Sequence, residues 1–251
     1  MNLGPWRARR AFTLIELLVV MGIIAILMVL VAPAFTNLKS AGVVTGAAYT
    51  VKGVLDQART YAMANNTYTW VGFYEEDVTQ PSTNPPTPGI GRLVMSVVAS
   101  KDGTMIYDPN SPAKITTTKL IQVGKLTKID NAHSWTHTDT PSGAGSTFDT
   151  RPNVTPTYCI GDTSPPNSTT PFQYPVGNPE PAAQYTFVKA VQFSPLGGAS
   201  IDNSTSSYPL QTAAEIGLEP THGNATPASI PANVVAIQFT GVGGDVKIYR
   251  R

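Results

Sequence analysis

The stretch RRAFTLIELLVVMGIIAILMVLVAPAF, residues 9–35, decides how the rest of the chain is interpreted. From Leu17 to Phe35 it contains no charged residue, and nearly every side chain is aliphatic. An apolar run of about 18 or more residues is long enough to cross a bilayer as a helix. One carboxylate, Glu16, stands just before this run, and an acid at the edge of a membrane span is costly. We therefore expect Glu16 to have a function. A basic cluster precedes it: Arg7, Arg9 and Arg10.

Three interpretations of residues 1–35 compete. A cleaved secretory signal has an apolar stretch of about 7–15 residues followed by a small-residue cleavage site. Here the apolar stretch is longer, and Pro33-Ala34-Phe35 is a poor cleavage site. A plain single-span anchor accounts for the length and for the arginines, which hold the amino end in the cytoplasm. It does not account for Glu16 or for the Phe-Thr-Leu-Ile-Glu sequence that leads to it.

The third interpretation accounts for both features. Residues 11–20, AFTLIELLVV, closely resemble the class III signal of type IV pilins and type II secretion pseudopilins. The resemblance implies that a prepilin peptidase cuts on the cytoplasmic side, between Ala11 and Phe12, and that Phe12 is then N-methylated. It also places Glu16 on the family's glutamate and Pro33 on the family's helix-kinking proline. The family usually has Gly before the cut, where this chain has Ala11.

Glu16 has a physical reason to lie beside a cation. An acid in a membrane helix pairs with a cation or becomes neutral, and the cut would create a new cation, the amino terminus of Phe12. Within one chain that amine lies one helical turn from Glu16, which allows an internal pair. The resemblance implies instead a pair with the terminal amine of the neighbouring subunit. Glu16 is therefore the expected assembly residue.

After Pro33, an amphipathic helix is expected to continue to about residue 64. Apolar residues recur there at three- and four-residue spacing, while charged residues fall largely off the stripe. Asn65-Asn66 is the expected stop. Residues 12–35 are thus the membrane or filament-core part of the helix, and residues 36–66 are the part that a sheet can cover. The stripe comprises Val44, Ala47, Ala48, Val51, Val54, Leu55, Ala58, Tyr61 and Ala62.

Beyond residue 66 the pattern predicts strands and loops. The first two strands are expected to pair antiparallel, and the last two are expected to form a hairpin across the turn GVGGD. A short helix is expected around residues 213–218. Residues 130–182, rich in Thr, Ser, Pro and Gly, are expected to form a long surface loop. The predicted strands span residues 67–74, 93–99, 185–193, 234–240 and 246–249, with a weaker one over 120–123.

Composition agrees with a loop-rich β unit outside the cytoplasm. The net charge of +1 gives no bulk electrostatic case for nucleic acid, and charged residues are sparse while Pro and Gly are plentiful. The expected fold is α+β and pilin-like: a cytoplasmic leader over residues 1–11, the long helix, and a small antiparallel β-sheet domain over residues 67–251. This layout, with QARTYAMANN, FSPLGGAS and the closing hairpin, resembles the GspH/FimT group of minor pseudopilins and minor pilins.

Motifs for catalysis or metal binding are weak. His133 and His137 have the spacing of a zinc helix, but HSWTH lies among Thr, Ser, Asp and Gly, which favours loop histidines. Glu75-Glu76-Asp77 offers oxygen ligands for calcium, but a solvated turn at a strand end is the better interpretation. Cys159, the only cysteine, has no partner motif, and GVGGD stands between strands rather than before a helix. No active site and no cofactor are expected.

The leading hypothesis is a structural subunit of a type II secretion pseudopilus or a type IV pilus, present as a minor component. Its expected partners are the prepilin peptidase/methyltransferase, other pilin or pseudopilin subunits and the inner membrane. The amino terminus would be cytoplasmic, and the globular domain periplasmic or extracellular. The alternative is a minor pilin that binds DNA or a surface, which requires a basic patch. Basic residues gather at the carboxyl end: Lys247, Arg250 and Arg251.

Overall fold

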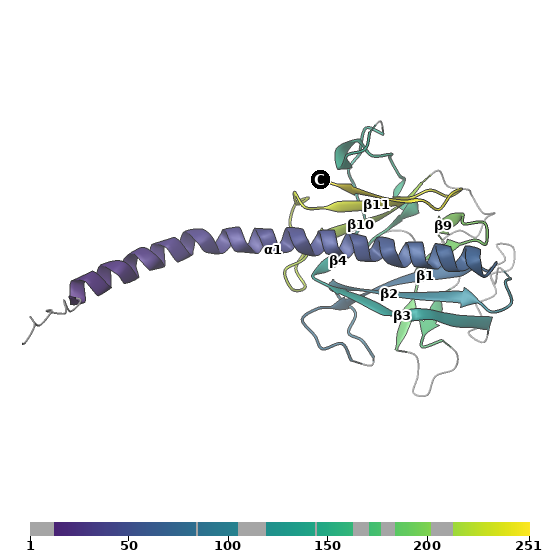
Figure 1. The fold of residues 1–251 in the computed structure, drawn as a ribbon, viewed down its shortest axis with the longest axis horizontal. Coiled ribbons are helices and arrows are strands. Elements are labelled where there is room, and N and C mark those ends of the chain that lie inside the picture. The colour runs from purple at the N-terminus through teal and green to yellow at the C-terminus, as the bar shows by residue number, and fades with distance from the viewer. Residues whose placement is uncertain are drawn as a thin grey trace, which may run out of the picture. The chain divides into compact units, whose positions relative to one another are not determined.

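A helix of 51 residues, α1 (Leu14–Ala64), is the longest element of the computed structural model (Figure 1). The chain divides into two compact units, residues 1–39 and 40–251. Pro33 lies inside α1, which continues beyond it, and the kink expected there stays a prediction. Among the described residues, no helix combines the length and the apolarity needed to cross a membrane. The structure describes residues 13–83, 85–104, 119–143, 145–162, 171–176, 184–201 and 213–251, with the backbone alone for residues 30–41.

The second half of α1 buries one face in the β unit. The apolar stripe predicted from the sequence is confirmed. All of its residues are buried except Tyr61, which is partly buried and packs on the same core. The helix also stops where predicted. Asn66 has a φ of 49°, in the left-handed region that ends helices, and the Thr67 N–H donates to the Ala62 carbonyl at 3.0 Å.

Two sheets pack on this face of α1 and share one core. Figure 1 shows β1 to β3 and β10 to β11 on either side of the helix. The first sheet has the order β3-β2-β1-β8-β9, and its strands are β1 (Thr69–Asp77), β2 (Gly91–Ser100), β3 (Leu120–Asp130), β8 (Lys189–Phe193) and β9 (Ala199–Ile201). The second has the order β12-β11-β10-β4, and its strands are β4 (Ala132–Trp135), β10 (Ala214–Pro220), β11 (Val235–Phe239) and β12 (Val246–Arg250). The short strand β5 (Cys159–Ile160) pairs parallel to β10.

The α+β class is confirmed, and so are two of the predicted strand pairings. Strands β1 and β2 pair antiparallel from Thr69↔Ala99 to Asp77↔Gly91. Strands β11 and β12 form the predicted closing hairpin, with Phe239 opposite Val246. The expectation of one small sheet is wrong, because the strands divide between two larger sheets and a two-stranded ribbon.

The ribbon pairs β6 (Phe172–Tyr174) with β7 (Tyr185–Phe187) and covers the face of the first sheet that is turned away from α1. Its aromatic rings approach Gly72 of β1 so closely that a Cβ there would lie 2.5 Å from the Phe187 Cβ. The predicted strand 185–193 is therefore two strands, because the chain leaves the ribbon at Val188 and enters the first sheet as β8.

The expectation of a long surface loop over residues 130–182 is also wrong. The described part of this segment supplies β4, β5, β6 and the short helices η2 (Phe148–Thr150) and η3 (Pro156–Tyr158). It also supplies fully buried side chains, among them Phe148, Arg151 and Phe172. The Thr- and Pro-rich composition of the segment gave no sign of these buried side chains, because their burial depends on packing against both sheets.

The short helix expected around residues 213–218 is a strand. Residues 214–220 form β10, an inner strand whose seven residues are all buried. Ile216 and Leu218 face the core on α1. The two acids of this strand are both buried: Glu215 lies beside Arg151, and Glu219 lies beside His133. Pairing with neighbouring strands therefore overrides the local helical pattern.

Candidate functional site

Two residues of the motif over residues 11–20, Thr13 and Glu16, form hydrogen bonds with each other at the start of α1. The Thr13 N–H and the Thr13 hydroxyl both donate to Oε2 of Glu16 at 2.8 Å, and the Glu16 N–H donates back to the Thr13 hydroxyl at 3.3 Å. The first helical bond follows, from the Leu17 N–H to the Thr13 carbonyl at 3.2 Å. This is a capping box, in which Thr13 is the N-cap and Glu16 satisfies a donor that the helix leaves free.

The turns that follow are apolar on every side. The large apolar side chains from Leu14 to Val29 are between 43% and 81% exposed, so none of them is buried against its own chain. A helix that is hydrophobic all round is stable only when lipid or other helices cover it. Ala11 and Phe12, the expected processing residues, lie outside the described residues.

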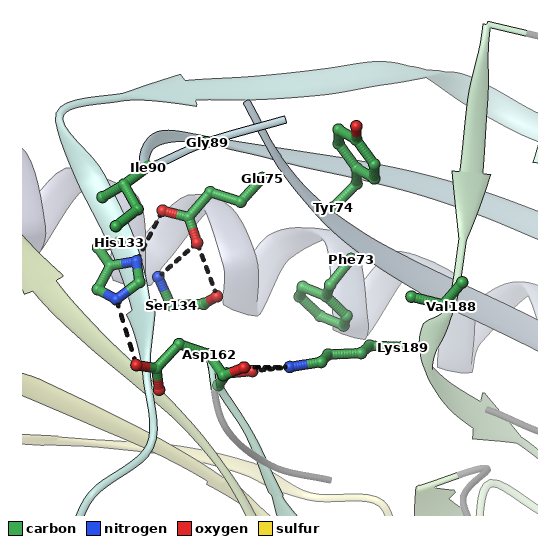
Figure 2. A pocket seen from close by; sticks show the side chains of 11 residues that line it. Phe73, Tyr74, Glu75, Gly89, Ile90, His133, Ser134, Asp162, Val188 and Lys189 are labelled. Atoms are coloured by element: carbon green, nitrogen blue, oxygen red, sulfur yellow. Dashed lines mark hydrogen bonds and ion pairs between the residues drawn. The ribbon is translucent and has the colours of Figure 1, made fainter. Parts of the chain in front are cut away.

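A cavity of about 290 Å³ lies between the ends of β1, β4 and β8, and Glu75 lines it (Figure 2). Oε1 of Glu75 lies 2.7 Å from Nδ1 of His133 and accepts the Gly91 N–H at 3.0 Å. Oε2 accepts the hydroxyl and the N–H of Ser134 at 3.1 and 3.4 Å. Glu75 therefore joins the first sheet to β4 of the second sheet, and its lone pairs are used within the chain.

His133 lies among carboxylates from three parts of the chain. Burial alone would lower the pKa of His133, but the hydrogen bond to Glu75, helped by the charges of Glu219 and Asp162, holds that pKa above its usual range. Burial raises the pKa of Glu219 to about 7, although His133 opposes the shift. Among the described residues, no group of His, Cys, Asp or Glu has the geometry of a metal site.

The cavity supplies little chemistry. The Ser134 hydroxyl donates to the Glu75 carboxylate rather than to an imidazole, so Ser134 and His133 do not form a serine–imidazole pair. The Lys189 ammonium donates to the carbonyl of Gly161 and, at 3.2 Å, to that of Asp162, and burial lowers the pKa of Lys189. The polar atoms at this site are thus engaged in holding the two sheets and the 161–162 segment together.

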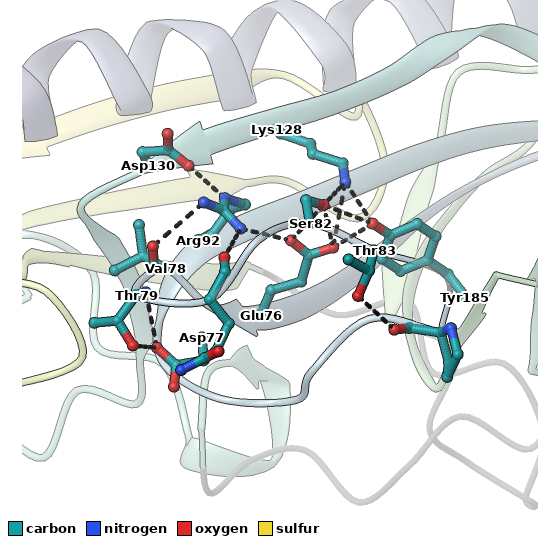
Figure 3. Close-up of polar contacts among 12 residues, drawn as sticks. Glu76, Asp77, Val78, Thr79, Ser82, Thr83, Arg92, Lys128, Asp130 and Tyr185 are labelled. Atoms are coloured by element: carbon teal, nitrogen blue, oxygen red, sulfur yellow. Dashed lines mark hydrogen bonds and ion pairs between the residues drawn. The ribbon is translucent and has the colours of Figure 1, made fainter.

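The next residue, Glu76, points to the opposite face of β1, and its side chain is 2% exposed (Figure 3). It accepts hydrogen bonds from Arg92 at 3.1 Å, Lys128 at 3.2 Å, Ser82 at 2.9 Å and the Tyr185 hydroxyl. These donors outweigh the effect of burial, so the pKa of Glu76 stays below its usual range. The expectation of a solvated turn at Glu75-Glu76-Asp77 is therefore wrong, because all three residues belong to β1 and two of them bind distant elements.

The two histidines of HSWTH are both buried, one on a strand and one in the loop that follows it. His133 lies on β4, and His137 follows it with 5% of its surface exposed. The His137 ring packs edge-on against Trp135 and Phe148, with Nε2 3.7 Å from Glu215. Burial is the main reason that the pKa of His137 lies below its usual range. The expectation of loop histidines is wrong for His133, which belongs to β4, and is confirmed for His137, which lies outside any strand or helix but is buried.

Arg151 is the centre of a buried ion-pair network beside His137. Its guanidinium donates to Glu215 at 2.8 and 3.1 Å, to Asp139 at 2.7 and 2.9 Å and to the Phe148 carbonyl at 2.8 Å. Nothing in the sequence marked Arg151, because its partners lie 12 and 64 residues away. Cys159 is buried, and burial raises the pKa of its thiol to about 12, which makes it a poor nucleophile.

The basic carboxyl end does not form a free cluster. The Arg251 guanidinium lies 3.6 Å from Asp149, and the Arg250 guanidinium lies 5.0 Å from the ring centre of Tyr49. Lys247 lies over the ring of Tyr249 at 4.7 Å. Each of these cations therefore contacts its own chain, and binding of DNA stays a prediction.

Comparison with known proteins agrees with the amino-terminal motif. A family model described as the prokaryotic N-terminal methylation motif matches residues 6–32. No curated protein and no solved structure matches the chain. The matched motif is the class III prepilin signal, and it indicates a precursor of the type IV pilin and pseudopilin kind. It implies processing by a prepilin peptidase, assembly with other pilins in general and a place in the cell envelope.

Proposed function

We propose that the chain is a minor structural subunit of a type II secretion pseudopilus or a type IV pilus, of the GspH/FimT kind. The match of the methylation motif over residues 6–32 supports the pilin or pseudopilin part of the proposal, and the assignment to the GspH/FimT kind rests on the resemblance of the sequence. Prepilin peptidase cuts between Ala11 and Phe12, Phe12 is N-methylated, and residues 12–35 hold the subunit in the cytoplasmic membrane before assembly. The β unit stands outside that membrane, and Pro33 bends the helix between its two parts.

Two observations support the proposal. The apolar side chains from Leu14 to Val29 are exposed on all sides, and a bundle of filament helices can cover them as completely as lipid does. The carboxylate of Glu16 at the start of this apolar segment needs a partner when water is absent. An amino terminus at Phe12 supplies that partner, and a neighbouring subunit presents it during assembly.

Intact-mass measurement of the full-length protein from its native host tests the proposal. The expected product begins at Phe12 and carries one added methyl group. An Ala11→Gly variant, which restores the usual residue before the cut, should give the same product, whereas the bulky Ala11→Leu should accumulate as precursor. A wild-type protein that keeps residues 1–11 and an unmethylated amino terminus would refute the proposal. Loss of secretion, of twitching or of DNA uptake in a deletion strain then identifies the machine.

A further inference from the structure

His133 lies where three parts of the β unit meet. Its Nδ1 is 2.7 Å from Oε1 of Glu75 on β1, and its Nε2 is 3.9 Å from Oδ2 of Asp162, beside the cavity (Figure 2). Glu219 of β10 stands directly opposite His133 in the register of the second sheet, where side chains are neighbours, and only 4% of its surface is exposed. One imidazole therefore lies among three carboxylates, which come from the first sheet, the second sheet and the segment after β5.

Two of these carboxylates also hold β4 and the segment after β5 in place. Oε2 of Glu75 accepts the Ser134 N–H at 3.4 Å, and Oδ1 of Asp162 accepts the Thr136 N–H at 3.1 Å. From β8, the Lys189 ammonium donates to the main-chain carbonyl of Asp162 at 3.2 Å. Charged side chains thus join β4, an outer strand of the second sheet, and residues 161–162 to the first sheet.

The charge balance of this cluster changes with pH. When His133 and Glu219 both carry a proton, two carboxylates face two cations, the second of which is Lys189. Loss of the Glu219 proton leaves three carboxylates against two cations, and loss of the His133 proton leaves them against one. Buried charges are weakly screened, so the excess negative charge pushes the carboxylates apart. Burial raises the pKa of Glu219 to about 7, and at His133 the neighbouring carboxylates outweigh burial and raise the pKa, so both protons leave as the pH rises through and above neutrality.

We propose that His133 and Glu219 form an acid-closed latch between the two sheets. With both residues protonated, β4 and residues 161–162 are held against β1 and β8. Without these protons, the three carboxylates repel one another, β4 loosens and the cavity of about 290 Å³ widens. The latch does not rest on the proposed function, because every group in it belongs to the β unit. A β unit outside the cytoplasmic membrane would meet the pH of its surroundings directly.

Hydrogen exchange of the Ser134 and Thr136 amides in the full-length protein, in detergent micelles, tests the latch. Exchange is measured at about pH 6 and about pH 8.5, each at several low urea concentrations, and is corrected for the intrinsic pH dependence of amide exchange. A local opening exposes little surface and depends weakly on urea. Global unfolding, reported by the Ile237 amide of the inner strand β11, depends on urea steeply.

We expect the opening equilibrium constant at Ser134 and Thr136 to rise about tenfold between these two pH values, with a weak urea dependence at both. This factor follows from a Glu219 pKa of about 7 in the closed state and its ordinary value near 4.5 in the open state.

Three variants assign the effect to the latch. Glu219→Gln keeps the side-chain volume and cannot ionise, so most of the rise with pH should be absent. His133→Gln should open roughly tenfold or more above the wild type at the lower pH, because a charge-assisted hydrogen bond to Glu75 is lost. His222→Gln, at an exposed histidine, is the matched control and should behave like the wild type.

The latch is refuted if the wild type opens equally at both pH values, if Glu219→Gln keeps the full rise, or if His133→Gln opens no more than His222→Gln. It is also refuted if exchange at Ser134 and Thr136 depends on urea as steeply as exchange at Ile237. None of these results bears on the proposed function, which the mass of the processed chain tests separately.

Discussion

Replacement of Arg151 by Met should destabilise the β unit more than any surface substitution. The side chains of Arg151 and Glu215 are each 2% exposed, and the guanidinium makes two hydrogen bonds to each of Glu215 and Asp139. Methionine fills much of the volume but leaves the Glu215 carboxylate buried, with the Gln238 amide, at 2.7 Å, as its one remaining hydrogen-bond donor within the described part of the chain. Removal of one partner of a buried ion pair costs about 3–5 kcal/mol.

Urea unfolding of the full-length protein in detergent micelles measures this loss. The midpoint should fall at an unchanged slope, because the change affects stability rather than the exposed surface. In a thermal scan, about 3–5 kcal/mol corresponds to roughly 6–20 °C for a unit of this size. Arg250→Met is the matched control: Arg250 is exposed, and its guanidinium lies over the ring face of Tyr49, a contact worth about 0.5–1 kcal/mol.

A second variant separates the cost of the lost hydrogen bonds from the cost of leaving the Glu215 carboxylate buried without a cation. Adding Glu215→Gln to Arg151→Met removes the uncompensated carboxylate, so the double variant should recover part of the lost free energy of unfolding. Two results would contradict a buried, mutually dependent network. The first is that Arg151→Met lowers the free energy of unfolding no more than Arg250→Met does. The second is that the double variant is less stable than Arg151→Met by the full amount that Glu215→Gln costs on its own.

Three further predictions concern pH and packing. Burial raises the pKa of Glu219 to about 7, so the folded state binds the Glu219 proton more tightly than the unfolded state, and the contribution of this proton to the free energy of unfolding is complete below about pH 4.5 and is lost as the pH rises through 7. Glu219→Gln should therefore exceed the wild type in free energy of unfolding by up to about 3 kcal/mol at pH 8 and match it near pH 4. Equal stability at pH 8 would count against the burial. Burial lowers the pKa of His137, so the contribution of the neutral ring to the free energy of unfolding is complete above about pH 6.5 and is lost as the pH falls. His137→Phe should therefore flatten the dependence of that free energy on pH below about pH 6.5, and an unchanged dependence would place the ring in solvent. Gly72→Ala should lower the free energy of unfolding in urea by about 1–3 kcal/mol, because the new Cβ would lie 2.5 Å from the Cβ of Phe187. Gly53→Ala on α1, where a Cβ would have nothing within 4 Å, should raise it by up to about 1 kcal/mol. Equal effects would mean that the ribbon is not packed on β1.

The elements that the sequence predicted correctly are those with local causes. The stripe from Val44 to Ala62 repeats at the helical period, and the period by itself identifies the buried face. The closing hairpin has two β-rich runs around a short Gly-rich turn, which leaves few other pairings. The amino-terminal motif is likewise a contiguous run of residues, and the family model matches it as such.

The polar sites could not be predicted in this way. Glu75 and Glu76 are adjacent in sequence, but they point to opposite faces of β1 and bind partners that lie up to 109 residues away. A run of acids is ordinarily solvated, and only the approach of His133, Lys128 and Tyr185 makes its burial favourable. The free energy of burying a charge depends on its partners rather than on its neighbours in the chain.

The sequence alone therefore determined the class of precursor, the start of the long helix and the face that this helix buries, because each follows from residues within a few positions of one another. The tertiary structure alone decided that the strands form two sheets and a ribbon, that residues 130–182 enter the core, and that Arg151, His137 and Glu219 are buried. Those outcomes depend on contacts between distant segments, and such contacts exist only after the chain has folded.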